Sequence, residues 1–139
     1  MSRAKNALIP VLGILLLCGT AASQCPVNTV IIKGRVENAS ANDKVRVQLV
    51  YPKNRPGEAG EVTVESGAFQ IPIEFVTMQS SMFSNLPKRC GRKPQTIVIT
   101  LLRNDQESDR VFLDFVKDLK LADTSAYIVR SELVLNRPH

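Results

Sequence analysis

The chain has 139 residues, 44% of them hydrophobic and 22% charged, and a formal net charge of +5 at pH 7. It shows no internal repeat, no low-complexity tract and no change of composition along its length, which argues against a repeat architecture or several domains. The only histidine, His139, is the last residue. Its position argues against Ser-His-Asp or Cys-His catalysis and against a zinc site.

Residues 1–23 are predicted to be a secretory signal peptide. Arg3 and Lys5 form a short positive region, an apolar run covers 7–18, and small residues follow as far as Ser23. A basic start, a short apolar core and small residues before the cleavage site are the parts of such a peptide. We expect cleavage after Ser23 or one or two residues earlier. No transmembrane segment is predicted, because no stretch has the ~20 apolar residues that a membrane helix needs.

Cleavage of the predicted signal peptide changes the net charge and the number of cysteines. Without residues 1–23 the chain keeps 16 basic and 13 acidic residues, a net charge of +3, which favours solubility more than a polyanionic partner. Two cysteines remain, Cys25 and Cys90, and an even number in an exported chain favours a disulfide. This bridge would close a loop of about 65 residues, worth about 4 kcal/mol in a chain-entropy calculation. The alternative to the bridge is two free thiols. For the N-terminal segment, the alternative is a lipoprotein signal with lipidation at Cys18, which is disfavoured because Leu17 is too bulky for the position before a lipidated cysteine.

Residues 24–139 are predicted to form one all-β domain. Apolar and polar residues alternate with a period of two in about seven short segments, a pattern typical of half-buried strands. Polar turns at 38–43 and 103–108, and a loop at 52–60 rich in proline, glycine and charge, separate these segments. The predicted strands, in chain order, are 29–36, 45–51, 61–65, 68–75, 96–102, 109–114 and 126–135.

The stretch from Glu61 to Phe75 carries the clearest strand signal. Two alternating segments meet at Ser66-Gly67, which predicts a tight hairpin. Pro72 interrupts the second segment and has no N–H for a ladder hydrogen bond, so this strand is predicted to lie at a sheet edge. The β-branched run 96–102 is predicted to be a central strand covered on both faces.

Two segments lack a clear alternation. Residues 76–94 are predicted to be a long loop draped over one end of the core, and loops of this length are often functional. Residues 109–124 fit both strand and helix spacing. We therefore expect a strand to about Asp114, followed by a short helical turn near 115–121.

About seven short strands and little helix predict an antiparallel β-sandwich. Four segments also match a "G-x-V" strand, a "V-x-V" strand, a "G-x-F-x-I" hairpin and a later β-branched strand. They are Ile-Lys-Gly-Arg-Val at 32–36, Val-Arg-Val-Gln-Leu at 45–49, Ser-Gly-Ala-Phe-Gln-Ile at 66–71 and Ile-Val-Ile-Thr-Leu at 97–101. With these segments the chain resembles the transthyretin-like and carboxypeptidase-regulatory-like β-sandwich superfamily, except in the loop around Cys90 and at 109–124.

This resemblance implies a binding or accessory module, since most members of the superfamily act as one, and it transfers no catalytic residue to this chain. A signal peptide before one small domain with two cysteines also resembles small secreted proteins of fungi and nematodes. No cofactor is predicted.

Asp105, Glu107, Asp109 and Asp114 form the main carboxylate cluster in the sequence. The simplest interpretation is a solvated turn. The alternatives are calcium binding through loop aspartates, as in C2-like sandwiches, and hydrolysis by a pair of carboxylates. No EF-hand spacing and no glycine-rich phosphate loop accompany the cluster, so no metal site is predicted.

Lys88, Arg89, Arg92 and Lys93 flank Cys90 and form the most concentrated group of charges. A disulfide-anchored loop with these cations would suit an acidic protein surface, a glycan sulfate or lipid headgroups, and the alternative is a solvated loop. Nucleic acid is disfavoured because the loop offers no aromatic side chains for stacking. Lys88-Arg89 also fits a dibasic processing site.

Asn38-Ala39-Ser40 is an N-glycosylation sequon in a predicted polar turn. Taken together, the sequence predicts a small secreted, non-enzymatic interaction module that binds an extracellular protein, such as a host protein, or an acidic surface through the loop at 76–93. The alternatives are a C2-like calcium or lipid binder, a small-ligand carrier, and a hydrolase that uses only carboxylates.

Overall fold

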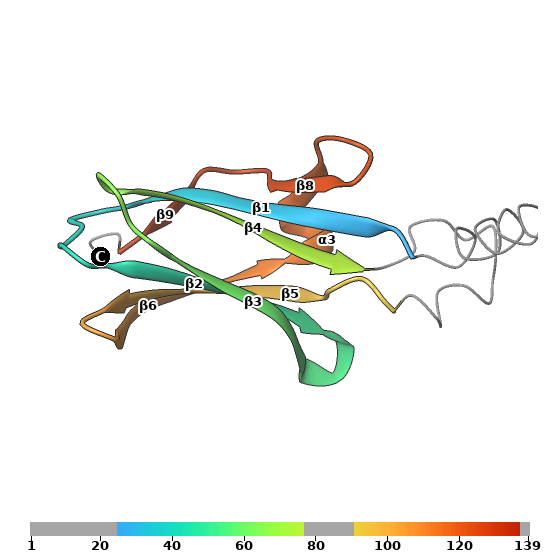
Figure 1. Cartoon of the computed structure of the whole chain (residues 1–139), viewed down its shortest axis with the longest axis horizontal. Helices are drawn as coiled ribbons and strands as arrows, with labels where there is room; N and C mark the ends of the chain where they lie inside the picture. The colour runs from blue at the N-terminus through green and yellow to red at the C-terminus, as the bar shows by residue number, and fades with distance from the viewer. Residues whose placement is uncertain (1–24, 77–90, 137–139) are drawn as a thin grey trace, which may run out of the picture.

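The computed structural model describes residues 25–76 and 91–136. In this part of the chain two β-sheets face each other around one hydrophobic core (Figure 1). The predicted all-β sandwich is therefore confirmed, with nine strands among the described residues rather than about seven.

Sheet A is the larger of the two sheets. Its strands are β1 (Val27–Val36), β4 (Ala68–Val76), β7 (Leu119–Leu121), β8 (Ala126–Val129) and β9 (Leu133–Leu135). They lie in the order β4-β1-β8-β7, and β9 pairs with β1 as well. β8 and β9 run parallel to β1 while β4 is antiparallel to it. Sheet A is thus mixed, whereas the sequence predicted a purely antiparallel fold.

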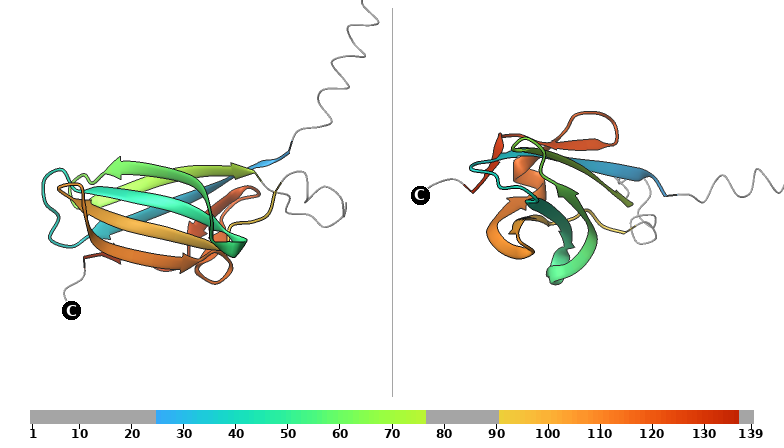
Figure 2. Two further views of the ribbon diagram at one scale, coloured as in Figure 1. Left: turned by 90° about the horizontal axis from the view of Figure 1, so that it is seen from below. Right: turned by 60° about the vertical axis from the view of Figure 1, so that its left-hand side comes forward.

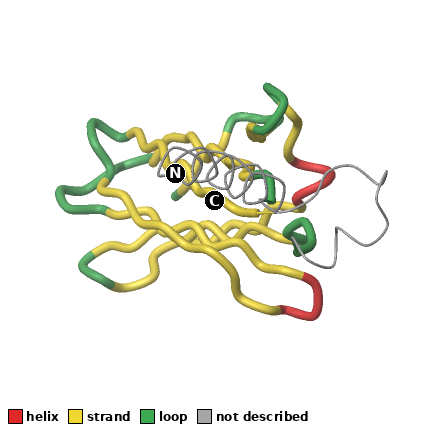
Figure 3. The backbone as a smooth tube through the Cα atoms, turned by 45° about the vertical axis from the view of Figure 1, so that its right-hand side comes forward, coloured by secondary structure: helices red, strands yellow, loops and turns green. Residues whose placement is uncertain are grey.

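Sheet B is antiparallel throughout and has the order β3-β2-β5-β6. Its strands are β2 (Lys44–Tyr51), β3 (Arg55–Thr63), β5 (Thr96–Arg103) and β6 (Gln106–Asp114). A 3-10 turn, η1 (Pro52–Asn54), joins β2 to β3. One helical turn, α3 (Phe115–Asp118), carries the chain from β6 to β7, where the sequence predicted it (Figure 3). The Asp114 carboxylate caps it by accepting hydrogen bonds from the backbone N–H groups of Val116 and Lys117.

The core lies between the two sheets, whose arrangement is seen in Figure 2, and the inward side chains of their strands form it. β4 alternates strictly, with every second side chain buried. Three aromatic rings lie together in the core, with centroids 4.8 Å apart for Phe115 and Tyr127 and 5.7 Å apart for Phe75 and Phe115. The buried hydroxyl of Tyr127 has no hydrogen-bond partner within the described part of the chain.

The hairpin predicted at Glu61 to Phe75 is only one residue pair long. Ser66 and Gly67 both have positive φ, 52° and 73°, and Glu65 and Ala68 exchange two backbone hydrogen bonds of 2.9 and 3.0 Å. Beyond this bridge the segments separate: β3 pairs with β2 in sheet B, and β4 pairs with β1 in sheet A. The tight turn was predicted correctly but the long hairpin was wrong, since the two apolar faces meet across the core instead of sharing one sheet.

Two predictions about strand position are confirmed. β4, which contains Pro72, is an edge strand that pairs only with β1. β5, which contains the run 96–102, lies in the middle of sheet B between β2 and β6. Its outer face is well covered at Thr100 and Leu102, both 8% exposed, but Val98 is only half-buried. No further layer packs on that outer face among the described residues. Side chains of the neighbouring strands, such as Arg46 and Phe112, surround it instead.

Three predicted boundaries need correction. The predicted loop at 52–60 is η1 followed by the first part of β3. The predicted turn at 103–108 shrinks to Asn104 and Asp105, whose positive φ values of 53° and 61° allow a two-residue hairpin turn. The predicted strand at 126–135 is interrupted and becomes β8 and β9, which both continue along β1.

At one end of the sandwich, the buried carboxylate of Asp43 forms an ion pair with Arg103. Asp43, 0% exposed, accepts hydrogen bonds from Nε and Nη2 of Arg103 at 3.1 and 2.9 Å and from the backbone N–H of Ser40 at 2.8 Å. The hydrogen bond from Arg103 is the main reason that the pKa of Asp43 is lowered, against the opposing effect of burial. The backbone carbonyl of Asp43 accepts from the N–H of Val64, and Arg103 also donates to the carbonyl of Asn38.

We predict that Asp43→Asn lowers the free energy of unfolding at pH 7 by about 2 kcal/mol, because the amide loses charge-assisted hydrogen bonds. The folded-state pKa of Asp43 lies below its unfolded value, so wild type loses this stabilisation as the pH falls through the folded pKa. Urea denaturation at pH 7 and pH 3 should therefore show a smaller difference between wild type and variant in acid. Glu74→Gln, at an exposed carboxylate, is the control and should change stability little at either pH. An equal difference in stability between wild type and Asp43→Asn at pH 7 and pH 3 would contradict the prediction.

At Gly34 the backbone of β9 lies close against β1. A Cβ atom there would lie 2.6 Å from the carbonyl oxygen of Leu133 and 2.8 Å from Cζ of Phe69. The first of these atoms belongs to the backbone of β9, which cannot give way without moving from β1.

We expect Gly34→Ala to destabilise the fold by about 1–3 kcal/mol, the usual cost of overpacking. Amide hydrogen exchange should show the loss first at β9, and urea denaturation gives the size of the effect. Lys33→Ala, at the neighbouring exposed position, should change little. Wild-type protection of β9 in Gly34→Ala would show that the close approach is not a constraint.

Candidate functional site

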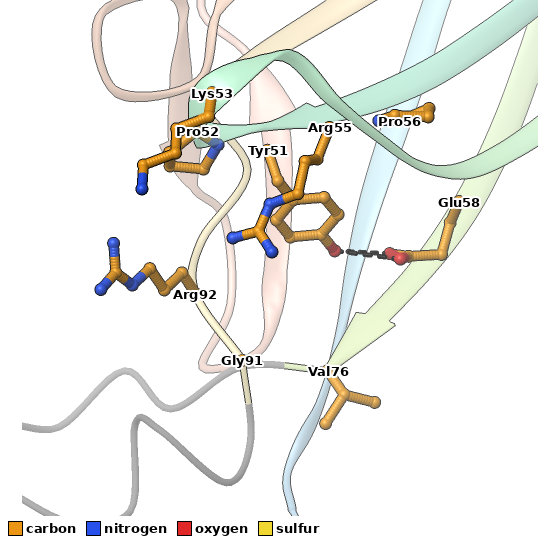
Figure 4. A pocket seen from close by; sticks show the side chains of 9 residues that line it. All are labelled: Tyr51, Pro52, Lys53, Arg55, Pro56, Glu58, Val76, Gly91 and Arg92. Carbon is orange, nitrogen blue, oxygen red and sulfur yellow. Dashed lines mark hydrogen bonds between the residues drawn. The ribbon is translucent and has the colours of Figure 1, made fainter.

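The described residues form a pocket of about 640 Å³. It lies at the end of the sandwich where η1 connects β2 to β3, beside the last residue of β4 and the segment that starts at Gly91 (Figure 4). The residues that line it are Tyr51, Pro52, Lys53, Arg55, Pro56, Glu58, Val76, Gly91 and Arg92.

The reversal between β2 and β3 brings two cations to the rim. Pro52 opens η1, and Lys53 and Asn54 then adopt left-handed backbone angles, with φ of 67° and 57°. The chain turns back at once, so that Arg55 pairs with Tyr51. Lys53 and Arg55 therefore lie at the tip of the connection, on either side of the turn.

Tyr51 lies against β3 because the strand leaves room for its ring. The register between β2 and β3 shifts after Gln48, which places one extra residue on β3 as a bulge. Gly57 is one of the residues in this bulge. A Cβ atom on it would lie 2.7 Å from Cδ2 of Tyr51 and closer still to Cε2, so only glycine accommodates the ring here.

Tyr51 and Glu58 form a polar pair within the pocket. The Tyr51 hydroxyl donates to the Glu58 carboxylate, with distances of 2.7 and 3.0 Å to its two oxygens (Figure 4). Burial, followed by the hydrogen bond to Glu58 and the negative charge of that residue, raises the pKa of Tyr51 well above its ordinary value. Tyr51 is therefore a neutral donor at physiological pH that fixes the position of Glu58.

The pocket contains three cationic side chains. Lys53, Arg55 and Arg92 form no salt bridge with any carboxylate of the described residues. In Figure 4 their nitrogen atoms lie on one side of the Tyr51 ring, and Glu58 lies on the other. Three cationic side chains that line a hollow with one carboxylate create a net positive potential there. The arrangement suits the binding of an anionic group.

The structure bears on the predicted basic cluster in part. Arg92 lines the pocket, and Lys93 is exposed next to it without lining it. Lys88 and Arg89 lie outside the described residues. Sequence reasoning missed Lys53 and Arg55; the signal was the pair of cations between two alternating segments, but nothing in the sequence placed them beside Arg92.

The predicted disulfide and the predicted glycosylation site each have one residue, Cys25 and Asn38, within the described part of the chain. Cys25 lies two residues before the start of β1, and Cys90 lies outside the described residues, so the Cys25–Cys90 bridge stays a prediction. Asn38 is exposed in the turn after β1, with φ of 50°.

The predicted carboxylate cluster is spread over separate contacts. The carboxylate of Asp105 is 88% exposed and 3.8 Å from Lys44, and Glu107 pairs with Arg110. Asp109 accepts a hydrogen bond from the backbone of Asn136. Within 25–76 and 91–136, no group of three or more His, Cys, Asp or Glu residues is placed to hold a metal ion. In those same ranges no helix has the length and apolar character required to cross a membrane.

Comparison with known proteins finds no similarity: no family model, no curated protein and no solved structure matches the chain.

The Tyr51–Glu58 pair predicts an unusual titration. The chain has two tyrosines, so in a Tyr127→Phe background the ultraviolet absorbance of phenolate reports on Tyr51 alone. We expect little ionisation at pH 10, near the pKa of an ordinary tyrosine. Glu58→Gln should lower the pKa of Tyr51 only in part, because burial is the largest cause of the shift. Glu65→Gln is the matched control, and half-ionisation near pH 10 in the Tyr127→Phe protein would refute the pairing.

Proposed function

We propose that this chain is a secreted, non-enzymatic interaction module that binds an acidic surface of an extracellular protein. The contact surface is the pocket together with the adjoining Arg92-Lys93 segment. The observation that carries the proposal is that Lys53, Arg55 and Arg92 line one hollow and pair with no carboxylate in 25–76 or 91–136.

The contrast with arginines elsewhere on the surface supports this proposal. Arg35, Arg46 and Arg110 each have a carboxylate within 3.0 Å, so their charges are balanced within the domain. The cations of the pocket have no such carboxylate among the described residues, which leaves their charge available to an external partner. Complementary charge of this kind speeds encounter and sets orientation more than it raises affinity, which fits a module that recognises a protein surface.

Secretion and the disulfide belong to the same proposal. The predicted signal peptide, residues 1–23, would take the chain to a compartment where Cys25 and Cys90 oxidise. The described neighbours of the two cysteines support their pairing: Val27 pairs with Val76, and a Cβ atom on Gly91 would lie 3.3 Å from the Val76 carbonyl oxygen. The bridge would then hold the segment of Arg92 at this end of the sandwich.

Glycosylation at Asn38 would leave the pocket open. Asn38 lies in the turn that leads into the start of β2, and Tyr51 lies at the other end of the same strand. A glycan on Asn38 would project from the end of the sandwich opposite the pocket. The two-sheet architecture is in keeping with the transthyretin-like resemblance, and a binding role is what that resemblance implies.

The test is capture of partners from extracellular material by the oxidised domain, residues 24–139. We expect the variant Lys53→Glu/Arg55→Glu/Arg92→Glu to lose the acidic partners that wild type retains, and wild-type capture to weaken as salt rises. A control with the same change of charge is Lys33→Glu/Lys117→Glu/Lys120→Glu, at exposed positions outside the pocket. Equal capture by both variants would overturn the assignment of the surface.

The predicted basic loop has its own test in the same assay. Reversing Lys88, Arg89, Arg92 and Lys93 together should weaken capture further if the whole loop contributes. Binding to anionic lipid vesicles with calcium, in place of protein capture, would favour the C2-like alternative and contradict the proposal.

A further inference from the structure

We infer that the pocket receives an extended acidic peptide segment rather than a densely charged glycan, and that Glu58, held by Tyr51, sets this selectivity. The inference rests on the function proposed above and identifies the class of ligand for that site. It follows from three features of the pocket: a cationic side, an apolar wall and a fixed negative charge.

The cationic side fits a carboxylate. Arg55 and Arg92 each present a planar guanidinium, which binds a carboxylate through two parallel hydrogen bonds, and Lys53 adds a third positive charge at the same rim. None of the three is held by a carboxylate of the described residues. An incoming acidic side chain therefore meets donors that it does not have to displace from another acid.

Part of the wall of the pocket is apolar. The half-buried ring of Tyr51 and the rings of Pro52 and Pro56 line it, together with Val76, which is 42% exposed. An apolar side chain next to the acidic residue of a peptide would cover this surface. The sulfate groups of a polysulfated glycan would instead place charge against it, at a cost in desolvation.

Glu58 opposes a polyanion. Its carboxylate is kept on the far side of the Tyr51 ring from the cations by the hydrogen bonds from Tyr51. A peptide whose acidic side chains are separated along its backbone is free to turn them toward the cations and to offer backbone N–H donors to Glu58. A chain that carries a sulfate on almost every sugar brings further negative charges within the ~8 Å screening length of that carboxylate. The net repulsion grows with the density of charge.

The experiment measures binding of three probes to the oxidised domain. They are a fluorescent peptide of sequence Gly-Leu-Glu-Phe-Asp-Leu-Gly, the same peptide with Gln and Asn for Glu and Asp, and a heparin hexasaccharide. Wild type should bind the acidic peptide about tenfold more tightly than the amide peptide, and more tightly than heparin. Arg55→Gln/Arg92→Gln should weaken the acidic peptide about tenfold, whereas Lys33→Gln/Lys117→Gln should not.

The variant Glu58→Gln tests whether Glu58 sets the preference for the peptide over heparin without contributing much to the affinity for the peptide. It should strengthen heparin binding about fivefold or more while changing the affinity for the acidic peptide much less. Thermal unfolding followed by circular dichroism shows whether each variant is folded. Tyr51→Phe is a second variant. Without the hydrogen bond from Tyr51, Glu58 is able to turn toward the cations, and the affinity for the acidic peptide should fall.

Two results would overturn the inference: tighter binding of heparin than of the acidic peptide by wild type, or an unchanged ratio of the two in Glu58→Gln. Either result leaves the proposed function standing if capture of a protein partner still depends on Lys53, Arg55 and Arg92. Loss of that dependence defeats the proposed function itself.

Discussion

One buried carboxylate sets the arrangement of the two sheets. Asp43 lies where the chain leaves sheet A for sheet B, and its side chain meets Arg103 at the end of β5, while its carbonyl meets Val64 on the way from β3 to β4. Three separate connections therefore converge on one residue. A buried ion pair adds little net stability compared with apolar packing, but its loss leaves a charge without partners. Alternative placements of these connections are disfavoured for that reason.

The two ends of the sandwich differ in how their charges are paired. At the end of Asp43, several charges near the turns are paired within the domain, as with Arg103 and Asp43, and Arg35 and Glu132. At the end of Tyr51, the pocket cations Lys53, Arg55 and Arg92 pair with no carboxylate of residues 25–76 and 91–136, and the carboxylate of Glu58 accepts a hydrogen bond from the Tyr51 hydroxyl. The ion pair at one end and the cationic pocket at the other are thus separated by the length of the sandwich.

The sequence allowed much of the fold to be predicted, because alternation depends on local burial. Pro72 identified an edge strand from the missing N–H alone, and the strand ending at Asp114 followed from spacing. Sheet membership was harder: Ser66-Gly67 specifies a turn but not which strands continue beyond it. Pro56 and Gly57 looked like a loop because a bulged edge strand tolerates both residues. The pocket was beyond prediction, since Arg55 and Arg92 meet only through tertiary structure.

The pairing of β1 has a consequence for the order of folding. This first strand finds its partners in β4, in the middle of the chain, and in β8 and β9, close to its end. Contacts so distant in sequence form slowly, because the intervening chain must be ordered first. Sheet A therefore cannot close until β8 and β9 have been synthesised, although β4 is able to pair with β1 well before then.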